Sequence, residues 1–210
     1  MTGILFDLDG TLLDTLEDLA DAVNYALQVH GYPSRTLQEV RRFIGHGAAS
    51  LIAQSVPEGK DSKPVLETFR PYYQAHSLDK TAPYPGILEA LAQIRETYPV
   101  AIVSNKPDPA VKTLCAQFFP GVFSLGETPD CPRKPAPDML YKTMDILGVD
   151  RFVYVGDSDS DVLTAHNAGA QCISVLWGFR DEEELRQAGA DYLCRRVCDL
   201  PELIRRATQL

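Results

Sequence analysis

Short apolar runs that end abruptly in polar residues are the main feature of the hydrophobic pattern. The first covers residues 4–8 and leads into Asp9, Gly10 and Thr11. It is too short for a stable helix and too apolar for a surface loop, so we expect a buried central strand. Asp7 then lies at the carboxyl end of that strand, where open α/β sheets bind ligands.

Asp7 and Asp9 lie two residues apart where the expected strand ends. Side chains two apart share a face only within a continuing strand, so the strand pattern does not decide whether both carboxylates face one site. Both carboxylates can serve one site if the chain turns at or near them, as Gly10 permits. The alternative is an ordinary Asp-Gly turn that closes a strand. The later segments favour the first interpretation.

Residues 15 to about 80 show helical spacing and no strand pattern. Asp14 followed by Glu17 resembles a helix start, and this first helix should end near His30-Gly31. A second amphipathic helix is expected from Leu37, broken at Gly45-His46-Gly47. A third is expected over about residues 63–76. We therefore expect a helical domain over 15–81, inserted in a core formed by 1–14 and 82–210.

From Pro85 onward, strand and helix patterns alternate, which is typical of a parallel sheet covered by helices. The helix patterns that we assign here cover residues 87–96, 109–118 and 138–147. The strand patterns cover residues 100–103, 122–124, 152–155, 173–176 and 191–193. The expected fold class is therefore α/β.

Polar residues follow three of the expected strands directly. They are Asp7 with Asp9, Ser104 with Asn105, and Asp157. Because the carboxyl ends of parallel strands share one edge of a sheet, we expect these side chains to meet there. Any one of them could instead be a polar cap of the following helix. Three together, with a lysine-bearing loop at Lys134, favour a common site.

Charge and composition narrow the classes of partner. The 210 residues carry a net charge of -9, and the basic clusters are only arginine pairs, so a nucleic-acid partner is not expected. No stretch has the length or apolarity of a membrane span or a signal peptide, and five scattered cysteines form neither a disulfide framework nor a zinc set. We expect a cytoplasmic protein, monomeric or homodimeric, with a small anionic ligand.

The chain resembles the haloacid dehalogenase-like phosphatases through four ordered motifs. They are Asp7-Leu8-Asp9-Gly10-Thr11, then Ser104, then Lys134 before Pro135-Ala136-Pro137, and finally Gly156-Asp157 with Asp161. The resemblance implies a Rossmann-like parallel sheet core with helices on both faces and a small helical cap domain inserted after the first strand.

The resemblance also implies roles for the motif residues. Asp7 would be the nucleophile that forms an aspartyl-phosphate, and Asp9 the general acid and base. Mg²⁺ would be held by Asp7, the Asp9 backbone carbonyl and Asp157, with Asp161 touching the ion or lying just behind it. Ser104 and Lys134 would hold the phosphoryl oxygens, and Gly10, Thr11 and Asn105 would belong to the substrate-binding group.

The residue types agree with these roles. If Asp7, Asp157 and Asp161 converged without a cation, like charges would be forced together and some of their pKa values would rise. A hard cation with oxygen ligands, such as Mg²⁺, resolves that conflict. Lys134 would let a phosphate dianion approach an anionic nucleophile. Asp159 is expected to be a solvated residue at a helix start.

The helical insert resembles the cap of the phosphoglycolate phosphatase group around residues 40–47. Arg41 and His46 are its candidate substrate contacts. The alternatives are that His46 is solvated in a glycine turn and that Arg41 pairs with Glu39. Phe69, Tyr72 and Tyr73 are expected to pack the cap helices.

The resulting expectation is an Mg²⁺-dependent phosphatase that hydrolyses a small, phosphoglycolate-like phosphomonoester. Asp9 argues against a dehalogenase, because the resemblance implies that halide-removing members lack an acid there. Sugar phosphomutase, inorganic pyrophosphatase and nucleotidase activities stay open as alternatives, as does a catalytically idle binding protein.

Overall fold

A computed structural model describes residues 1–209 of the chain. A sheet with the strand order β5-β4-β1-β6-β7-β8 forms its centre, and every neighbouring pair in it is parallel. The α/β prediction is thereby confirmed. The strands are β1 (Thr2–Phe6), β4 (Val100–Pro107), β5 (Phe123–Glu127), β6 (Arg151–Gly156), β7 (Gln171–Val175) and β8 (Tyr192–Cys194).

Strand β1 lies between β4 and β6 and is buried on both faces. Ile4 and Phe6 face one hydrophobic core, and Leu5 faces the other, because successive side chains of a strand alternate. The strand ends at Phe6, whereas the sequence pattern placed its end at Leu8. Asp7 still donates its backbone N–H to Val155 (2.8 Å), but beyond it the chain turns.

Helices cover both faces of the sheet. Two separate hydrophobic cores, one on each face, show which helix packs where. On the Ile4 face lie α5 (Ile87–Arg95), α6 (Asp108–Phe118) and α10 (Leu200–Thr208), and on the Leu5 face lie α7 (Asp138–Leu147), α8 (Asp159–Asn167) and α9 (Glu182–Gln187). A short 3-10 turn covers Val197–Asp199. No helix among residues 1–209 combines the length and apolarity needed to cross a membrane.

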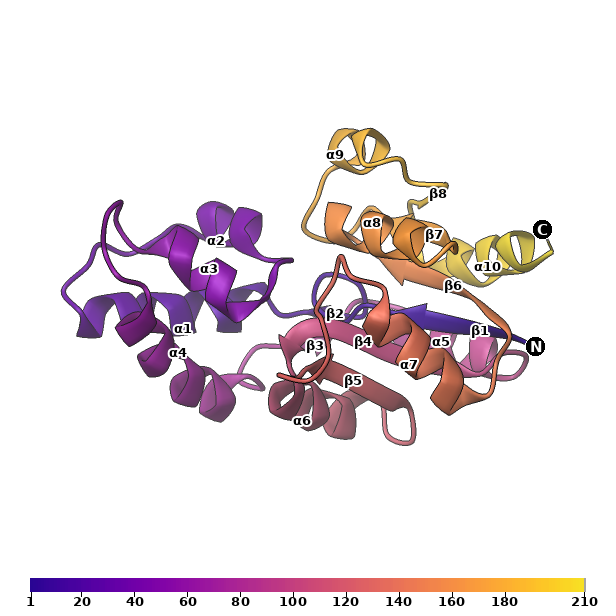
Figure 1. Ribbon diagram of the computed structural model, residues 1–210, viewed down its shortest axis with the longest axis horizontal. Coiled ribbons are helices and arrows are strands. Elements are labelled where there is room, and N and C mark those ends of the chain that lie inside the picture. Colours follow the sequence, from indigo (N-terminus) through magenta and orange to yellow (C-terminus); the bar gives the residue numbers. More distant parts are fainter. Residues whose placement is uncertain (210) are drawn as a thin grey trace.

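Four further helices form a unit of their own, with a third hydrophobic core (Figure 1). They are α1 (Leu16–Val29), α2 (Leu37–Phe43), α3 (Gly47–Ser55) and α4 (Lys63–His76). Figure 1 shows this helical unit at one end of the molecule, with the arrow of β1 pointing from the N-terminus toward it. The unit therefore stands at the carboxyl edge of the sheet.

The chain enters and leaves the helical unit through a two-stranded antiparallel ribbon, β2 (Leu13–Asp14) with β3 (Ala82–Pro83). The buried Asp18 carboxylate closes this junction by accepting hydrogen bonds from the backbone N–H groups of Lys80 and Thr81 and from the Thr81 hydroxyl. Helix α3 was not predicted as a separate element. The break at residues 45–47 is real, but a new helix begins there at once.

Candidate active site

The ends of three strands and the helical unit enclose one cavity of about 320 Å³. Asp7, Asp9, Ser104, Asn105 and Asp157 all line it, as the sequence pattern predicts for strand ends on one sheet edge. Strand β4 runs on to Pro107, so Ser104 and Asn105 lie within the strand and not after it. The remaining lining residues are Leu19, Ile44, Gly45, Gly47, Ala48, Leu51, Phe69, Arg70, Pro71, Tyr73, Gln74, Lys106, Pro107, Pro109, Ala110, Ser158, Phe179 and Arg180.

Asp7, Asp157 and Asp161 form a buried group of carboxylates, each offering an oxygen within 4.8 Å of the others. Burial raises the pKa of Asp7 to about 7, and the Asp161 and Asp9 charges add to that effect while Lys134 opposes it. Burial and the charges of Asp161 and Asp7 raise the pKa of Asp157 well above its usual value. The carboxylates thus lie where the ionised forms need a cation.

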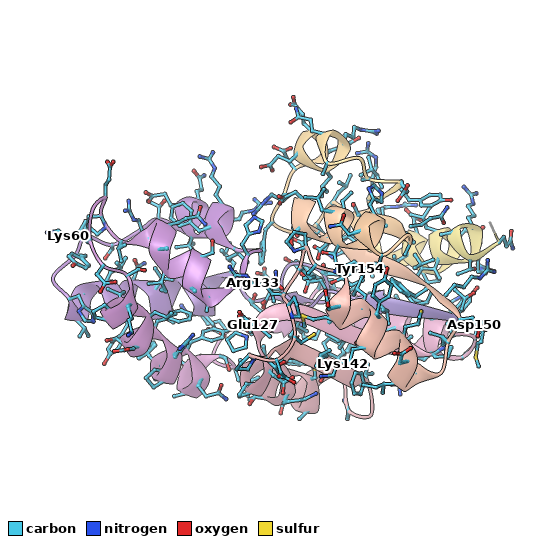
Figure 2. The ribbon with its side chains drawn as sticks, viewed as in Figure 1. Lys60, Glu127, Arg133, Lys142, Asp150 and Tyr154 are labelled. Atoms are coloured by element: carbon cyan, nitrogen blue, oxygen red, sulfur yellow. The ribbon has the colours of Figure 1, made fainter. Side chains whose placement is uncertain are left out.

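Lys134 supplies the positive charge beside Asp7. Its Nζ donates to Asp161 Oδ1 (2.6 Å) and to the Tyr154 hydroxyl (2.9 Å), and lies 3.1 Å from Asp7 Oδ1. Figure 2 shows Tyr154 within the sheet half of the molecule. Burial alone would lower the pKa of Lys134, but the facing Asp161 and Asp7 carboxylates outweigh it and raise that pKa. The lysine therefore stays charged behind Asp7.

Asp161 accepts hydrogen bonds at both of its carboxylate oxygens. Its second oxygen, Oδ2, accepts from the Ser158 hydroxyl (2.7 Å) and from the backbone N–H groups of Ser158 and Asp157. The helix begins only at Asp159, with Ser158 and Asp161 forming its capping box. The Asp157 and Asp161 carboxylates are therefore brought together by the turn and the cap at the start of α8.

Asp157 is fixed by residues of the first motif and of the segment after β7. Its oxygens accept from the Thr11 hydroxyl (2.9 Å) and from the Phe179 N–H (2.8 Å). A Cβ at Gly10, where φ is +79°, would come within 2.3 Å of this carboxylate, and one at Gly178 would come within 2.5 Å of it. Thr11 and Gly10 do not line the cavity, but they contact Asp157 and so fix its position. Their contact with substrate stays a prediction.

Asp9 points into the cavity and is paired with a residue that the sequence did not single out. Lys106 Nζ donates to both Asp9 oxygens, at 2.7 and 2.9 Å, and its side chain is 3% exposed. The same ammonium lies 4.6 Å from the centre of the Tyr73 ring. Period-two alternation from Ser104 would have placed Lys106 on the same face of the strand. Tyr73 and Phe69 pack the helical unit as expected, but both also line the cavity.

Asn105 holds the lysine loop and the helical unit to the strand. Its Oδ1 accepts from the Lys134 N–H (2.8 Å), and its Nδ2 donates to the carbonyls of Lys134 (3.1 Å) and Gly45 (3.2 Å). Nearby, Arg133 and Glu127 lie where the helices meet the sheet half (Figure 2), 3.7 Å apart as an ion pair. The position of the glycine turn is thus tied to that of Lys134.

Arg41 and His46, the candidate substrate contacts of the helical unit, do not line the cavity. Arg41 donates to the carbonyls of Phe179 (3.0 Å) and Gly178 (2.7 Å) and not to Glu39, which pairs with Arg35. Their contact with substrate stays a prediction.

Asp159 is not simply solvated, as the sequence suggested. Its carboxylate lies 3.8 Å from His46 Nε2 and 3.6 Å from Arg180 Nε. Arg180 is buried and donates to the Ile44 carbonyl (2.6 Å), so it joins helix α8 to the end of α2. Sequence reasoning had no signal for Arg180, because its partners are backbone carbonyls far away in the chain.

The donor set fits a hard divalent cation. The group offers only carboxylate oxygens, which suit Mg²⁺. Asp7 Oδ1 is buried with the Lys134 ammonium 3.1 Å away and makes no other polar contact in the described residues, so this carboxylate has lone pairs left for a further ligand. Asp7 and Asp157, which both line the cavity, are the side chains that would hold the ion. The Asp9 backbone carbonyl and Asp161 as further ligands stay predictions.

Comparison with known proteins gives a consistent result. Residues 4–175 match the model of a family described as haloacid dehalogenase-like hydrolase. A phosphoglycolate phosphatase of Photorhabdus laumondii subsp. laumondii is 30% identical over 94% of this chain and 89% of its own, and one of Pseudomonas putida is 35% identical over 84% and 70%.

Solved structures agree with the sequence relatives. A crystal structure from Lactobacillus delbrueckii subsp. bulgaricus, of a protein named by inference as a phosphoglycolate phosphatase, is 36% identical with a TM-score of 0.91, covering 97% of this chain and 98% of that one. CbbY from Rhodobacter sphaeroides, in complex with phosphate, is 26% identical with a TM-score of 0.77, covering 95% and 96%.

Proposed function

The chain belongs to the haloacid dehalogenase-like hydrolases, and from that premise we propose that it is a Mg²⁺-dependent phosphatase that transfers the phosphoryl group of a small phosphomonoester to Asp7. Its class, phosphoric monoester hydrolase, follows from the relatives. The observation that supports this mechanism best is the buried Asp7 carboxylate, which lines the cavity and has the Lys134 ammonium 3.1 Å from its Oδ1.

The first half-reaction forms a covalent intermediate. An Asp7 oxygen attacks phosphorus, the bond from phosphorus to the ester oxygen breaks, and Asp9 gives a proton to the departing alkoxide. Lys134 would offset the charge of the approaching phosphate, and Ser104, which lines the cavity, would donate to a phosphoryl oxygen. Mg²⁺, when bound, neutralises charge on the phosphoryl oxygens and on the carboxylates.

The second half-reaction returns the enzyme to its starting state. Asp9, now ionised, takes a proton from water, which attacks the aspartyl-phosphate and releases inorganic phosphate and the Asp7 carboxylate. Lys106 holds Asp9 by both oxygens and so orients it toward the cavity. Lys106 is accordingly a positioning residue for the acid and base.

The helical unit is proposed to act as a cap, corresponding to an inserted domain over 15–81. This unit supplies about half of the residues that line the cavity, so its closure would exclude water from the reaction. The named relatives make phosphoglycolate the reference substrate for this site.

Phosphatase activity tests the proposal directly. With p-nitrophenyl phosphate, we expect turnover that requires Mg²⁺ and stops with EDTA, and no turnover above background in Asp7→Asn. The matched control is Asp145→Asn, an exposed carboxylate of α7, which should keep wild-type rates. Wild-type turnover by Asp7→Asn, or full activity in EDTA, would contradict the mechanism.

A further inference from the structure

We propose that the alcohol released by this phosphatase is apolar and uncharged, so that phosphomonoesters of small aliphatic or aromatic alcohols are better substrates than phosphoglycolate. The inference rests on the proposed function, because it concerns the part of the same cavity that faces away from Asp7. Two observations support it: the side chains that line this part of the cavity are mostly apolar, and the cationic side chains nearby already have partners or are exposed to water.

The buried side chains that the helical unit contributes to the wall are apolar, apart from Tyr73. Leu19 of α1, Leu51 of α3 and Phe69 of α4 line the cavity and are themselves at most 5% exposed, and Ala48 and Phe179 continue the surface. A carboxylate placed against such a wall would lose its hydration without gaining a partner, whereas an alkyl or aryl group would gain by leaving water.

The cations around the cavity are already engaged or lie at its rim. Lys106 is bound to Asp9, and the buried Arg180 donates to backbone carbonyls. Arg70 lines the cavity but is exposed, so water screens it. A second negative group on the substrate would also face the carboxylates of Asp7, Asp9 and Asp157, which repel it.

Tyr73 is a buried polar residue of this wall, beside the exposed Arg70 and Gln74 of the same helix. The residue is 4% exposed and its hydroxyl has no hydrogen-bond partner. Because a buried hydroxyl without a partner is costly, a substrate with one hydrogen-bond acceptor at that point would gain from pairing with it. The volume of about 320 Å³ is near the lower end of the roughly 300 to 1,000 Å³ of small-molecule sites.

A homologous series of substrates tests the inference on the wild-type protein. We compare methyl, propyl and pentyl phosphate with phosphoglycolate, whose carboxylate takes the place of an apolar group. Burial of methylenes predicts that kcat/KM rises about fourfold per methylene until the cavity is full. The kcat/KM for phosphoglycolate should be at least tenfold lower than that for propyl phosphate, because its carboxylate loses hydration against the apolar wall. A tenfold loss corresponds to only about 1.4 kcal/mol.

A variant with a new cation in the wall should reverse that preference. Ala48→Arg places a guanidinium at the cavity and should raise the ratio of kcat/KM for phosphoglycolate to that for propyl phosphate about tenfold or more. Ala49→Arg, at the next, exposed position of α3, carries the same charge outside the cavity and should leave the ratio unchanged. Calorimetric binding of propylphosphonate and phosphonoacetate to the wild type gives a second measurement that needs no variant.

The outcomes separate this inference from the proposed function. Hydrolysis of p-nitrophenyl phosphate with a flat alkyl series, or with phosphoglycolate preferred, would overturn the apolar leaving group alone. Tighter binding of phosphonoacetate than of propylphosphonate would do the same. If no phosphate ester, including p-nitrophenyl phosphate, were hydrolysed, the proposed function would fail and the inference with it.

Discussion

Buried charges in this site are arranged in facing pairs. Lys134 lies between Asp161 and Asp7, and Lys106 holds Asp9, with both ammonium groups almost fully buried. Removing one partner of such a pair would leave an uncompensated charge, which typically costs about 3–5 kcal/mol. A conservative amide substitution that keeps the side-chain shape is therefore the clearest way to test a carboxylate here.

Asp9→Asn should affect substrates according to their leaving group. An alkyl phosphate releases a basic alkoxide that needs a proton, so its first step should slow by about 10²- to 10⁴-fold. p-Nitrophenolate leaves without a proton, so its first step should change little and the aspartyl-phosphate should accumulate. Rapid-quench kinetics would show a burst of phenolate followed by slow turnover. Equal losses with both esters and no burst would remove Asp9 from acid and base catalysis.

The turn between α2 and α3 couples the helical unit to the strand ends. Gly45 and Gly47 have φ values of +123° and +81°, which favour glycine. A Cβ at Gly47 would lie 3.2 Å from the Asn105 carbonyl oxygen, and Asn105 in turn binds the Lys134 loop. A side chain added at this turn would therefore affect the positions of both the helical unit and strand β4.

Gly47→Ala should raise KM or change the substrate preference several-fold, because the turn must move away from Asn105. Gly59→Ala is the matched control, since its φ of +75° imposes similar backbone strain while nothing lies within 4 Å of the added Cβ. Both variants should lose similar thermal stability, and only Gly47→Ala should show altered kinetics across a panel of phosphate esters. Identical kinetics in the two variants would mean that the turn only separates two helices.

Residues 1–209 form three hydrophobic cores, two on the faces of the sheet and one within the helical unit. The cavity lies where the third core meets the sheet edge, so it borders charged residues on one side and apolar residues on the other. Burial raises the pKa values of Asp7 and Asp157 at this junction. The ionised carboxylates therefore oppose folding until a cation binds.

Mg²⁺ should accordingly stabilise the folded protein. At a concentration about a hundred times its Kd, linkage gives about 2.7 kcal/mol, or a rise in Tm of roughly 5–10 °C for a chain of this size. Differential scanning calorimetry of the EDTA-treated protein with and without Mg²⁺ measures this shift. Asp157→Asn should lose most of it, and Asp145→Asn should keep it. A full shift in Asp157→Asn would exclude that carboxylate from the metal site.

The sequence by itself determined that helices and strands alternate and that the sheet is parallel. It also determined that Asp7, Asp9, Ser104 and Asp157 meet at one edge of that sheet. These follow from local periodicity and from the rule that parallel strands end on the same side. Three local details escaped that reasoning: β1 ends at Phe6, β4 runs on to Pro107, and a new helix starts at Gly47.

Only the tertiary structure decided what the site residues touch. Lys106 on Asp9, Arg180 on the Ile44 carbonyl and Arg41 on the Gly178 carbonyl join segments about a hundred residues apart or more. Backbone carbonyls are the same at every position, so no sequence pattern marks the ones that a buried arginine will choose. The apolar wall is likewise formed by helices whose sequence predicts only that they pack. Which packed side chains are left facing a cavity depends on how two units fit together, and that is a property of shape in three dimensions.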